Sequence, residues 1–313
     1  MNTRSTTPAP SRVHTAELPV LPIVITTLMS MDVNDEDSFT KLLKLARLEP
    51  CLAVKVLRIA ATAGTVRGWD TLEKAMIRIG VSGLHRVVSE QSSAQIFVPT
   101  TLAEKGMWLH FLQVAMLSER LAQTFSQLRI DSDKAYLAGL LHDVGRLIRY
   151  EIIAHSPNEI ESSDYHNPET LLHAETQAFG HSHVKIGSDA CGSWSLPGYL
   201  NAAIAHHHNA LNKLSKHDIE SRRIVEVVQF ADELSVFALR RFSESAEALH
   251  ELIQGFMSER SVFLKTQKLK PGLLAELLKQ TIEQSEQRFL DLSVGPVKQK
   301  LSPAAAVHRV FSA

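Results

Sequence analysis

The amino-acid sequence predicts an all-α fold. From Ile23 onward nearly every segment carries apolar residues three or four positions apart, which is the period of an amphipathic helix. Pro, Gly, Ser and Asp residues stand where such helices should begin or end. Segments that alternate apolar and polar residues are nearly absent, and Val-rich pieces such as Arg86 to Val88 lie within helical contexts.

The first part of the chain predicts a tail followed by an N-terminal helical subdomain. Residues 1–16 are rich in Ser, Thr and Pro, so we expect a flexible tail. Leu18 to Pro22 should be extended, because each proline restricts the residue before it. Helical stripes then cover Phe39 to Leu48, Leu52 to Ala60, Trp69 to Ile79 and, after a cap at Ser82, the residues through Val88. The interruption at Phe97 to Thr101 ends this subdomain, which we place at residues 17–100.

Residues 101–240 predict a second helical unit. A long helix over about Met107 to Leu128 precedes Asp131-Ser-Asp133, which is a capping sequence for a helix that leads to His142-Asp143. The stretch Glu159 to Glu169 is polar and contains a proline, as loops do. Further helices are predicted over Leu171 to Phe179, His183 to Trp194, Tyr199 to His208 and Ser221 to Phe242.

Residues 241–313 are predicted to form a C-terminal helical extension. Helical periodicity is found near Glu244 to Leu264 and again over Pro271 to Leu292. These helices are expected either to complete the core or to form a homodimer contact.

The bulk composition is typical of a cytoplasmic globular protein. Hydrophobic residues make up 44% and charged residues 21% of the 313 residues, which is ordinary for a soluble domain. The net charge of −1 gives no broad attraction to nucleic acid or to an anionic membrane. Cys51 and Cys191 are the only cysteines, which fits a reducing cytoplasm. No segment has the apolar core of a signal peptide or the roughly 20 apolar residues of a membrane span.

The most informative motif is His142-Asp143, set in Ala138-Gly-Leu-Leu-His-Asp-Val-Gly-Arg146. An imidazole and a carboxylate in an apolar segment are costly to bury unless another group compensates them. A metal ion is the obvious compensating group, because both side chains are good ligands. The structural alternative is that Asp143 caps a neighbouring helix.

Further residues of ligand type stand elsewhere along the chain. They are His110, His183, His207, His208 and Asp232. Each alone has an ordinary interpretation, as a core or surface histidine or as a carboxylate on a helix surface. Together they put ligand types on several separate helices, which is how helical bundles build metal sites. The consecutive histidines 206–208 point about 100° apart on a helix, so at most two can face one centre.

Other polar residues could support such a site or its chemistry. Histidine ligands need a hydrogen-bond partner that fixes the ring, and Glu175 and Asp189 are candidates, with plain surface charge as the alternative. Two metals bridged by Asp143 would activate water and clamp a phosphoryl oxygen. Arg146 could neutralise a phosphate oxygen, or it could form a surface ion pair. The sequence contains no P-loop, dinucleotide fingerprint or Gly-x-Ser-x-Gly elbow.

The order of these residues resembles the HD superfamily of metal-dependent phosphohydrolases, and more closely the HDOD (HD-related output domain) proteins of bacterial signalling. The resemblance covers residues 17–240. It is carried by Leu18-Pro-Val-Leu-Pro22, Glu49-Pro-Cys-Leu-Ala-Val-Lys-Val-Leu-Arg-Ile-Ala60, Thr71-Leu-Glu-Lys-Ala-Met-Ile-Arg-Ile-Gly80, Leu137-Ala-Gly-Leu-Leu-His-Asp-Val-Gly-Arg146, Phe179-Gly-His-Ser-His-Val-Lys-Ile-Gly187, Trp194-Ser-Leu-Pro197 and Ile204-Ala-His-His-His208. The spacing from Ile204 matches His207 and His208 to the paired histidines of the family, and His206 is the extra one.

The resemblance implies an HD-like helical bundle core, a role in bacterial signal transduction and a protein partner. Many HDOD domains have lost metal ligands, whereas the HD-type set is present here, which implies one or two divalent ions of Fe, Mn, Ni or Zn. The related HD-GYP phosphodiesterases carry an acidic residue and a Gly-Tyr-Pro loop after the paired histidines. Here Asn-Ala-Leu-Asn follows His208, and Gly106 stands where those enzymes can carry another acidic ligand. Cyclic di-GMP hydrolysis is therefore not supported.

Two functions remain open from the sequence. The first is a regulatory output protein with an HD-type metal site, motivated by the N-terminal subdomain that a minimal hydrolase would not require. The second is an active metal-dependent phosphohydrolase for a nucleotide or other phosphoester, in which Asp143 and Arg146 are the catalytic residues. The near-neutral charge and the lack of a recognition motif disfavour a third class, regulators that bind nucleic acid.

Overall fold

The computed structural model describes residues 18–63, 68–91, 96–99, 102–152, 168–209, 214, 216–241 and 270–292. The predicted all-α class is confirmed, since helices dominate these residues and the isolated parallel bridge between Val20 and Ile96 is their one extended pairing. The predicted tail over residues 1–16, most of the polar stretch at 159–169 and the helix near 244–264 lie outside the described residues. None of the described helices is both long and apolar enough to cross a membrane.

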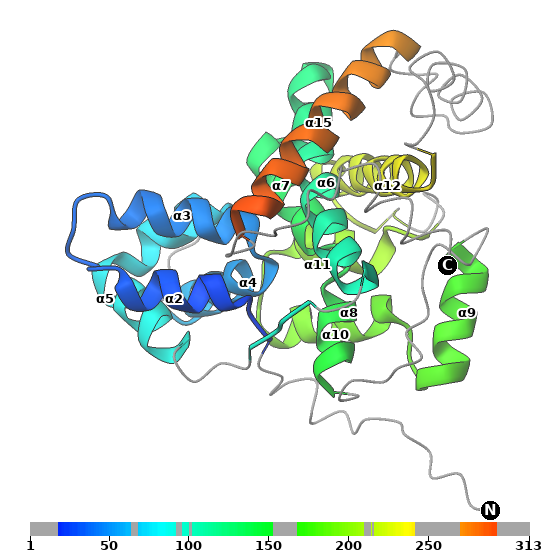
Figure 1. The fold of residues 1–313 in the computed structure, drawn as a ribbon. Helices are drawn as coiled ribbons and strands as arrows, with labels where there is room; N and C mark the ends of the chain where they lie inside the picture. The colour runs from blue at the N-terminus through cyan, green and yellow to red at the C-terminus, as the bar shows by residue number, and fades with distance from the viewer. Residues whose placement is uncertain are drawn as a thin grey trace, which may run out of the picture.

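The N-terminal helices lie together on one side of the molecule (Figure 1, blue to cyan). They are α2 (Pro22–Ser30), α3 (Ser38–Leu48), α4 (Pro50–Thr62) and α5 (Leu72–Gln91). Proline begins α2 and α4, where its missing N–H costs nothing, and Glu49 caps α4 by accepting a hydrogen bond from the Leu52 amide. The helix end expected at Gly80 is confirmed: Gly80 is non-helical, with a φ of 58° that favours glycine, and it separates two helical segments that meet at a kink inside α5.

The helices from α6 to α12 form a second group, in which α6 lies at the centre (Figure 1). They are α6 (Leu102–Thr124), the 3₁₀ turn η1 (Ser126–Leu128), α7 (Ser132–Leu141), α8 (Val144–Ile152), α9 (Pro168–Phe179), α10 (His183–Ser193), α11 (Gly198–His206) and α12 (Ile219–Arg241). The helix expected to reach Leu128 ends at Thr124, because η1 tightens the chain and Arg129 turns it with a φ of 49°. The predicted cap is confirmed, since Asp131 accepts from the Asp133 amide at 2.9 Å.

Two glycines allow helices to approach closely at the centre of this group. A Cβ on Gly139 of α7 would lie 2.7 Å from the Val114 carbonyl oxygen of α6. A Cβ on Gly145 of α8 would lie 1.9 Å from the His183 carbonyl oxygen of α10. These contacts bring the backbone around His142-Asp143 against both α6 and α10.

The C-terminal helix α15 (Pro271–Leu292) lies across α6 and reaches α3 (Figure 1, orange). Its buried face includes Leu274, Leu278 and Ile282, which recur every fourth residue. Arg120 of α6 donates hydrogen bonds to Gln280 at 3.1 Å and to Gln284 at 2.7 Å. This part of the predicted extension therefore packs on the core, while the homodimer contact remains a prediction.

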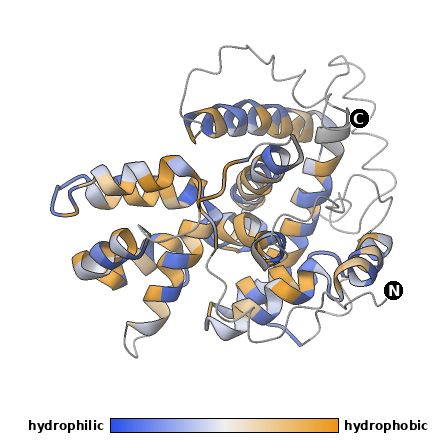
Figure 2. Cartoon of the chain, turned by 60° about the horizontal axis from the view of Figure 1, so that its bottom comes forward, coloured by the Kyte–Doolittle hydropathy of each residue, from blue (hydrophilic) through white to orange (hydrophobic). Residues whose placement is uncertain are grey.

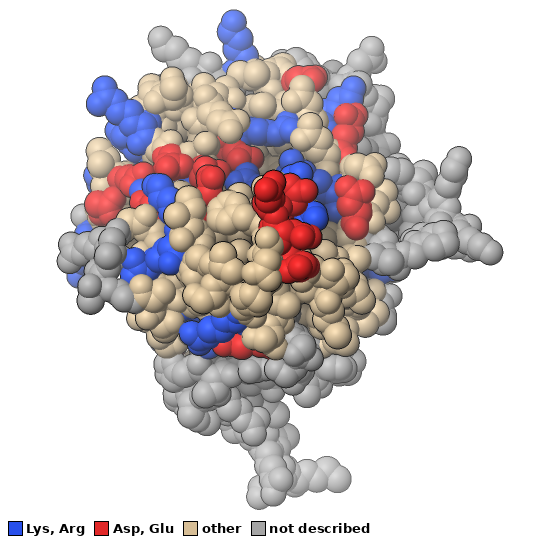
Figure 3. Space-filling model, turned by 90° about the vertical axis from the view of Figure 1, so that its left-hand side faces the viewer, with Lys and Arg blue, Asp and Glu red and all other residues tan. Residues whose placement is uncertain are grey.

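The distribution of residue types follows this packing. The apolar faces of the helices, orange in Figure 2, are turned toward one another and form one hydrophobic core. On the side where the N-terminal helices lie, Lys and Arg are interspersed with Asp and Glu (Figure 3). The mixture of signs agrees with the net charge of −1.

Candidate metal centre

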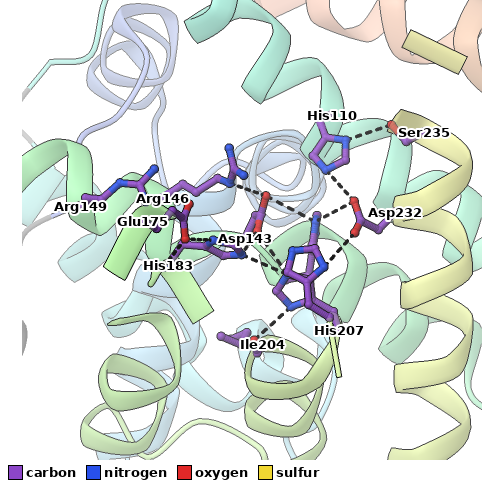
Figure 4. Close-up of polar contacts among 12 residues, drawn as sticks. His110, Asp143, Arg146, Arg149, Glu175, His183, Ile204, His207, Asp232 and Ser235 are labelled. Carbon is purple, nitrogen blue, oxygen red and sulfur yellow. Dashed lines mark hydrogen bonds and ion pairs between the residues drawn. The ribbon is translucent and has the colours of Figure 1, made fainter. Parts of the chain in front are cut away.

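The ligand residues predicted from the sequence come together at one buried point between α6, α8, α10, α11 and α12 (Figure 4). His110 lies on α6, His142 and Asp143 form the turn between α7 and α8, His183 begins α10, His207 and His208 follow α11, and Asp232 lies on α12. The fold thus brings together predicted ligand residues that lie far apart in the sequence and on separate helices.

One group of ligand atoms surrounds the Oδ1 atom of Asp143. His183 Nε2 lies 3.0 Å and His207 Nε2 lies 3.3 Å from this oxygen, and the two nitrogens are 3.3 Å apart. One ligand atom from each of Asp143, His183, His207 and His208 lies within 4.8 Å of the others. Imidazole nitrogens with a carboxylate oxygen are donors that first-row divalent ions accept.

A second group shares Asp143 with the first. Ligand atoms of His110, His142 and Asp143 also lie within 4.8 Å of one another. Asp232 Oδ1 lies 3.2 Å from His110 Nε2 and 3.8 Å from His142 Nε2. Because Asp143 belongs to both groups, it is the carboxylate that could bridge two adjacent ions, as in two-metal sites.

The protonation of His142 fits a ligand. Its Nδ1 lies 2.7 Å from the Gly139 carbonyl oxygen, which can only accept, so Nδ1 carries the hydrogen. Burial lowers the pKa of His142 to about 4, so the ring is neutral at pH 7 and its Nε2 holds a lone pair. Within the described residues this buried Nε2 has no hydrogen-bond partner. An ion at the centre would satisfy an atom whose isolation is otherwise costly.

His207 is oriented in the same way. Its Nδ1 lies 3.1 Å from the Ala203 carbonyl oxygen and 3.0 Å from that of Ile204. Since carbonyl oxygens only accept, Nδ1 donates and Nε2 is directed to Asp143 and His183. Burial and the adjacent His207 hold the pKa of His208 well below its ordinary value, so this ring is also neutral.

Glu175 of α9 holds the opposite side of His183. Its Oε2 accepts from His183 Nδ1 at 2.6 Å and from the His183 amide at 2.9 Å, while Arg149 donates to Oε1 at 2.8 Å. Burial opposes the charge of both groups, but Asp143 and Glu175 raise the pKa of His183, and His183 lowers that of Glu175. Of the two partners predicted for a ligand histidine, Glu175 is in place. Asp189 is a surface carboxylate that pairs with Lys185 at 2.6 Å.

Arg146 contacts the shared carboxylate directly. Its Nε lies 2.9 Å from Asp143 Oδ2, and both side chains are buried, so the alternative of a surface ion pair is wrong. Burial disfavours the charged form of Asp143, yet Arg146 and His183 hold its pKa well below the usual range. The carboxylate is therefore ionised and able to bind a cation.

Some supporting residues were not predicted from the sequence. His110 Nδ1 lies 3.0 Å from the Ser235 hydroxyl, which donates to Gln113 at 2.8 Å. Ser235 stands three positions after Asp232 on α12, so helical spacing was the signal that could have found it. His206, the extra histidine, stands apart from these groups, and its Nδ1 lies 2.9 Å from Asn209 Nδ2.

The donor set as a whole fits one or two divalent ions. Such an ion acts as a Lewis acid toward a phosphoryl oxygen and lowers the pKa of water that it binds. The residues of the chain contribute the ionised Asp143, neutral rings at His142 and His208, and a cationic Arg146 at the edge.

Comparison with known proteins agrees with this fold. The model of the HDOD domain matches residues 18–210, so Asp232 on α12 lies beyond the matched segment. Ribonuclease Y of Acetivibrio thermocellus is 26% identical over 192 residues, which cover 59% of this chain and 29% of that protein. Ribonuclease Y of Lachnoclostridium phytofermentans is 25% identical over 193 residues, which cover 59% of this chain and 30% of that protein. The chain thus spans less than a third of either relative.

Two solved structures share the fold at low sequence identity. The MmoQ response regulator of Methylococcus capsulatus has a TM-score of 0.57 at 18% identity, over 76% of this chain and 92% of that one. A virulence factor of Campylobacter jejuni has a TM-score of 0.56 at 15% identity, over 91% of this chain and all (100%) of the other. These likenesses concern the fold alone.

Proposed function

Because the chain belongs to the HDOD domain family, we propose that it is a bacterial signal-transduction output protein of the cytoplasm whose HD-type centre binds one or two divalent ions. The ligands are His110, His142, Asp143, His183, His207, His208 and Asp232. The state of this centre governs the N-terminal helices, which present a surface to a protein partner.

The observation that carries this proposal is the position of α7. Its C-terminal end leads directly into His142 and Asp143, while its first turns contact the N-terminal helices. Every residue from Ala135 to Leu141 is buried, so the helix is packed along this length. A ten-residue helix is about 15 Å long and behaves as a rigid element. A shift at the ligand turn is therefore expected at the other end of α7.

The contacts at the first turns of α7 are specific. Arg47 of α3 pairs with Asp133 at 2.9 Å, and its guanidinium lies 3.9 Å from the centroid of the Tyr136 ring. Lys134 lies 2.8 Å from Asp70, which precedes α5, and 2.9 Å from Glu220 of α12. These pairs join the N-terminal helices to the element that carries the ligands.

Hydrogen–deuterium exchange with and without Mn²⁺ tests this coupling. We expect Mn²⁺ to slow exchange in α3 and α5 as well as around the centre, and Asp143→Asn to abolish both effects. Lys134→Met should retain the effect at the centre and in α3, which keeps its own pair between Arg47 and Asp133, and lose it in α5, which Lys134 reaches through Asp70. Lys185→Met, which removes a surface pair, is the matched control. If Mn²⁺ slows exchange at the centre alone in the unaltered protein, the regulatory route through α7 is wrong.

A second candidate function is hydrolysis of a phosphoester by the same centre. The observation that favours it is the sharing of Asp143 between two ligand groups, with Arg146 2.9 Å from its Oδ2. In this mechanism Asp143 is the shared ligand and Arg146 binds a phosphoryl oxygen. The ribonuclease Y relatives cleave RNA, as their name states, so RNA belongs among the substrates to be tested beside nucleotides.

A substrate screen separates the two functions. Protein loaded with Mn²⁺ is incubated with nucleotides, a synthetic phosphodiester and a short single-stranded RNA. Hydrolysis requires turnover that disappears in Asp143→Ala and falls in Arg146→Gln while the latter still binds Mn²⁺. Bound Mn²⁺ without turnover on any of these substrates leaves regulation as the function of the centre.

A further inference from the structure

The geometry points to Glu175 as the residue that positions His183 for metal binding and thereby links the docking of α9 to the occupancy of the centre. This inference rests on the metal centre proposed above. Metal binding by the group that contains His183 then depends on the Glu175 carboxylate, which is not itself a ligand.

Among the described residues, the hydrogen bonds of Glu175 either hold His183 or balance the charge of the carboxylate. The side chain is fully buried, and an ionised carboxylate there is costly unless it is paired and hydrogen-bonded. Oε2 accepts from both Nδ1 and the amide of His183, and Oε1 accepts from Arg149. A carboxylate only accepts, so Nδ1 carries the hydrogen and Nε2 is directed at Asp143, 3.0 Å away.

The partner of His183 Nδ1 differs from those of the other ligand histidines. The Nδ1 atom of His208 lies 3.7 Å from Asp232 Oδ2, which is beyond hydrogen-bonding distance. The Nδ1 atoms of His142 and His207 bond to backbone carbonyl oxygens, and that of His110 lies beside the Ser235 hydroxyl. Those partners are neutral, whereas His183 is held by an ionised carboxylate. A carboxylate partner fixes the ring and makes it a more basic ligand than a neutral partner does. The group of Asp143, His183, His207 and His208 should therefore bind its ion more tightly than the group containing His110 and His142.

Helix α9, which carries Glu175, packs on the molecule through one face. Its buried residues Leu171, Glu175 and Phe179 recur every fourth position and form one face of the helix. Arg149 contacts two residues of α9. Its guanidinium lies 4.7 Å from the centroid of the Phe179 ring, and it also pairs with Glu175. Docking of α9 thus places Glu175 on His183. By linkage, an ion at His183 must stabilise the docked helix by as much as docking favours the ion.

Titration with Co²⁺ tests the inference in the full chain, with absorption bands that report histidine coordination. Glu175→Gln keeps the size of the side chain and removes its charge. We expect the tighter Co²⁺ site to weaken by about 10- to 100-fold, with altered bands, while the second site is unchanged. The matched control is Asp189→Asn, which neutralises a surface carboxylate on α10 and should titrate like the unaltered protein.

A double variant distinguishes positioning from simple charge balance. Glu175→Gln combined with Arg149→Gln removes both buried charges, so the protein folds without an unpaired ion and carries the test if the single variant does not fold. Weak Co²⁺ binding in the folded double variant supports positioning by Glu175. Recovery of the original affinity in the double variant, or an unchanged titration in the single variant, overturns it. If the unaltered protein takes up no Co²⁺, the proposed centre itself fails, and this inference fails with it.

Discussion

Replacement of Gly145 by alanine should separate α8 from α10 and displace a ligand of the centre. The added Cβ would lie 1.9 Å from the His183 carbonyl oxygen and 2.9 Å from the Gly187 amide nitrogen. Ordinary contacts of a Cβ begin at 3.4 Å. Both close neighbours are backbone atoms, so no side chain can rotate to make room. The helices must move apart by the difference of 3.4 and 1.9 Å, which is about 1.5 Å.

The magnitude of the effect follows from this displacement. Extra atoms in a well-packed core cost about 1–3 kcal/mol, and the backbone clash places Gly145→Ala at the upper end of that range. Metal-ligand distances tolerate only about 0.2 Å, so a His183 that moves with α10 no longer reaches an ion beside Asp143. We therefore expect a loss of about 3 kcal/mol in unfolding free energy together with the loss of one bound ion.

Urea unfolding and Mn²⁺ titration measure both effects. The matched control is Gly192→Ala on α10, where an added Cβ meets nothing within 4 Å. This control should be neutral or more stable by up to about 1 kcal/mol, because alanine is the better helix former. A Gly145→Ala protein that unfolds at the same urea concentration as the unaltered protein and binds the same number of ions would refute the reasoning.

Three further predictions concern other sites. Burial raises the pKa of Glu49 to about 8 from 4.5, so the unfolded chain loses its proton first and stability should fall as pH rises from 4.5 to 8. Glu49→Gln should flatten this fall, whose limiting slope is about 1.4 kcal/mol per pH unit, in urea unfolding repeated across that range. Asp131→Ala removes the cap of α7 and should lower the free energy of unfolding by about 1 kcal/mol, whereas Asp131→Asn should lower it little. Thermal unfolding of the two variants measures this difference. Removal of bound metal with a chelator should lower the melting temperature of the unaltered protein and leave that of Asp143→Asn unchanged, because Asp143 belongs to both ligand groups.

The fold was predictable because helical periodicity depends on residues that are close together in the sequence. The stripes of α3 and α4, the Asp131 cap and the proline starts all involve residues within a few positions of one another. The helix end at Gly80 was predictable for the same reason, because glycine readily adopts the positive φ at which the helix is interrupted.

The candidate ligand residues were predictable by residue type, but the residues that hold them in place were not. Imidazole and carboxylate side chains in apolar segments mark His142, Asp143 and Asp232 as unusual. Helical spacing places Ser235 on the same face of α12 as Asp232, but it does not specify the contact with His110, which spans 125 positions. Glu175 and Asp189 look equivalent in sequence, and only the packing of α9 against α10 separates the buried carboxylate from the exposed one.

The close approach of α7 to α6 and of α8 to α10 could not be predicted from the sequence either. Gly145 and Gly139 resemble other glycines along the chain, and the need for them arises from the backbones of α10 and α6. The pairs of Arg47 with Asp133 and of Lys134 with Asp70 likewise join segments that are distant in sequence. These features depend on tertiary packing, which periodicity does not specify.

Elemental analysis shows whether the clustered histidines and aspartates form a metal centre. Protein purified without chelators is compared with Asp143→Asn, chosen because Asp143 belongs to both ligand groups. We predict one or two equivalents of Fe, Mn, Ni or Zn in the unaltered protein and almost none in the variant. Unaltered protein that contains none of these metals, and takes up none when they are supplied, would contradict the proposal of a metal centre.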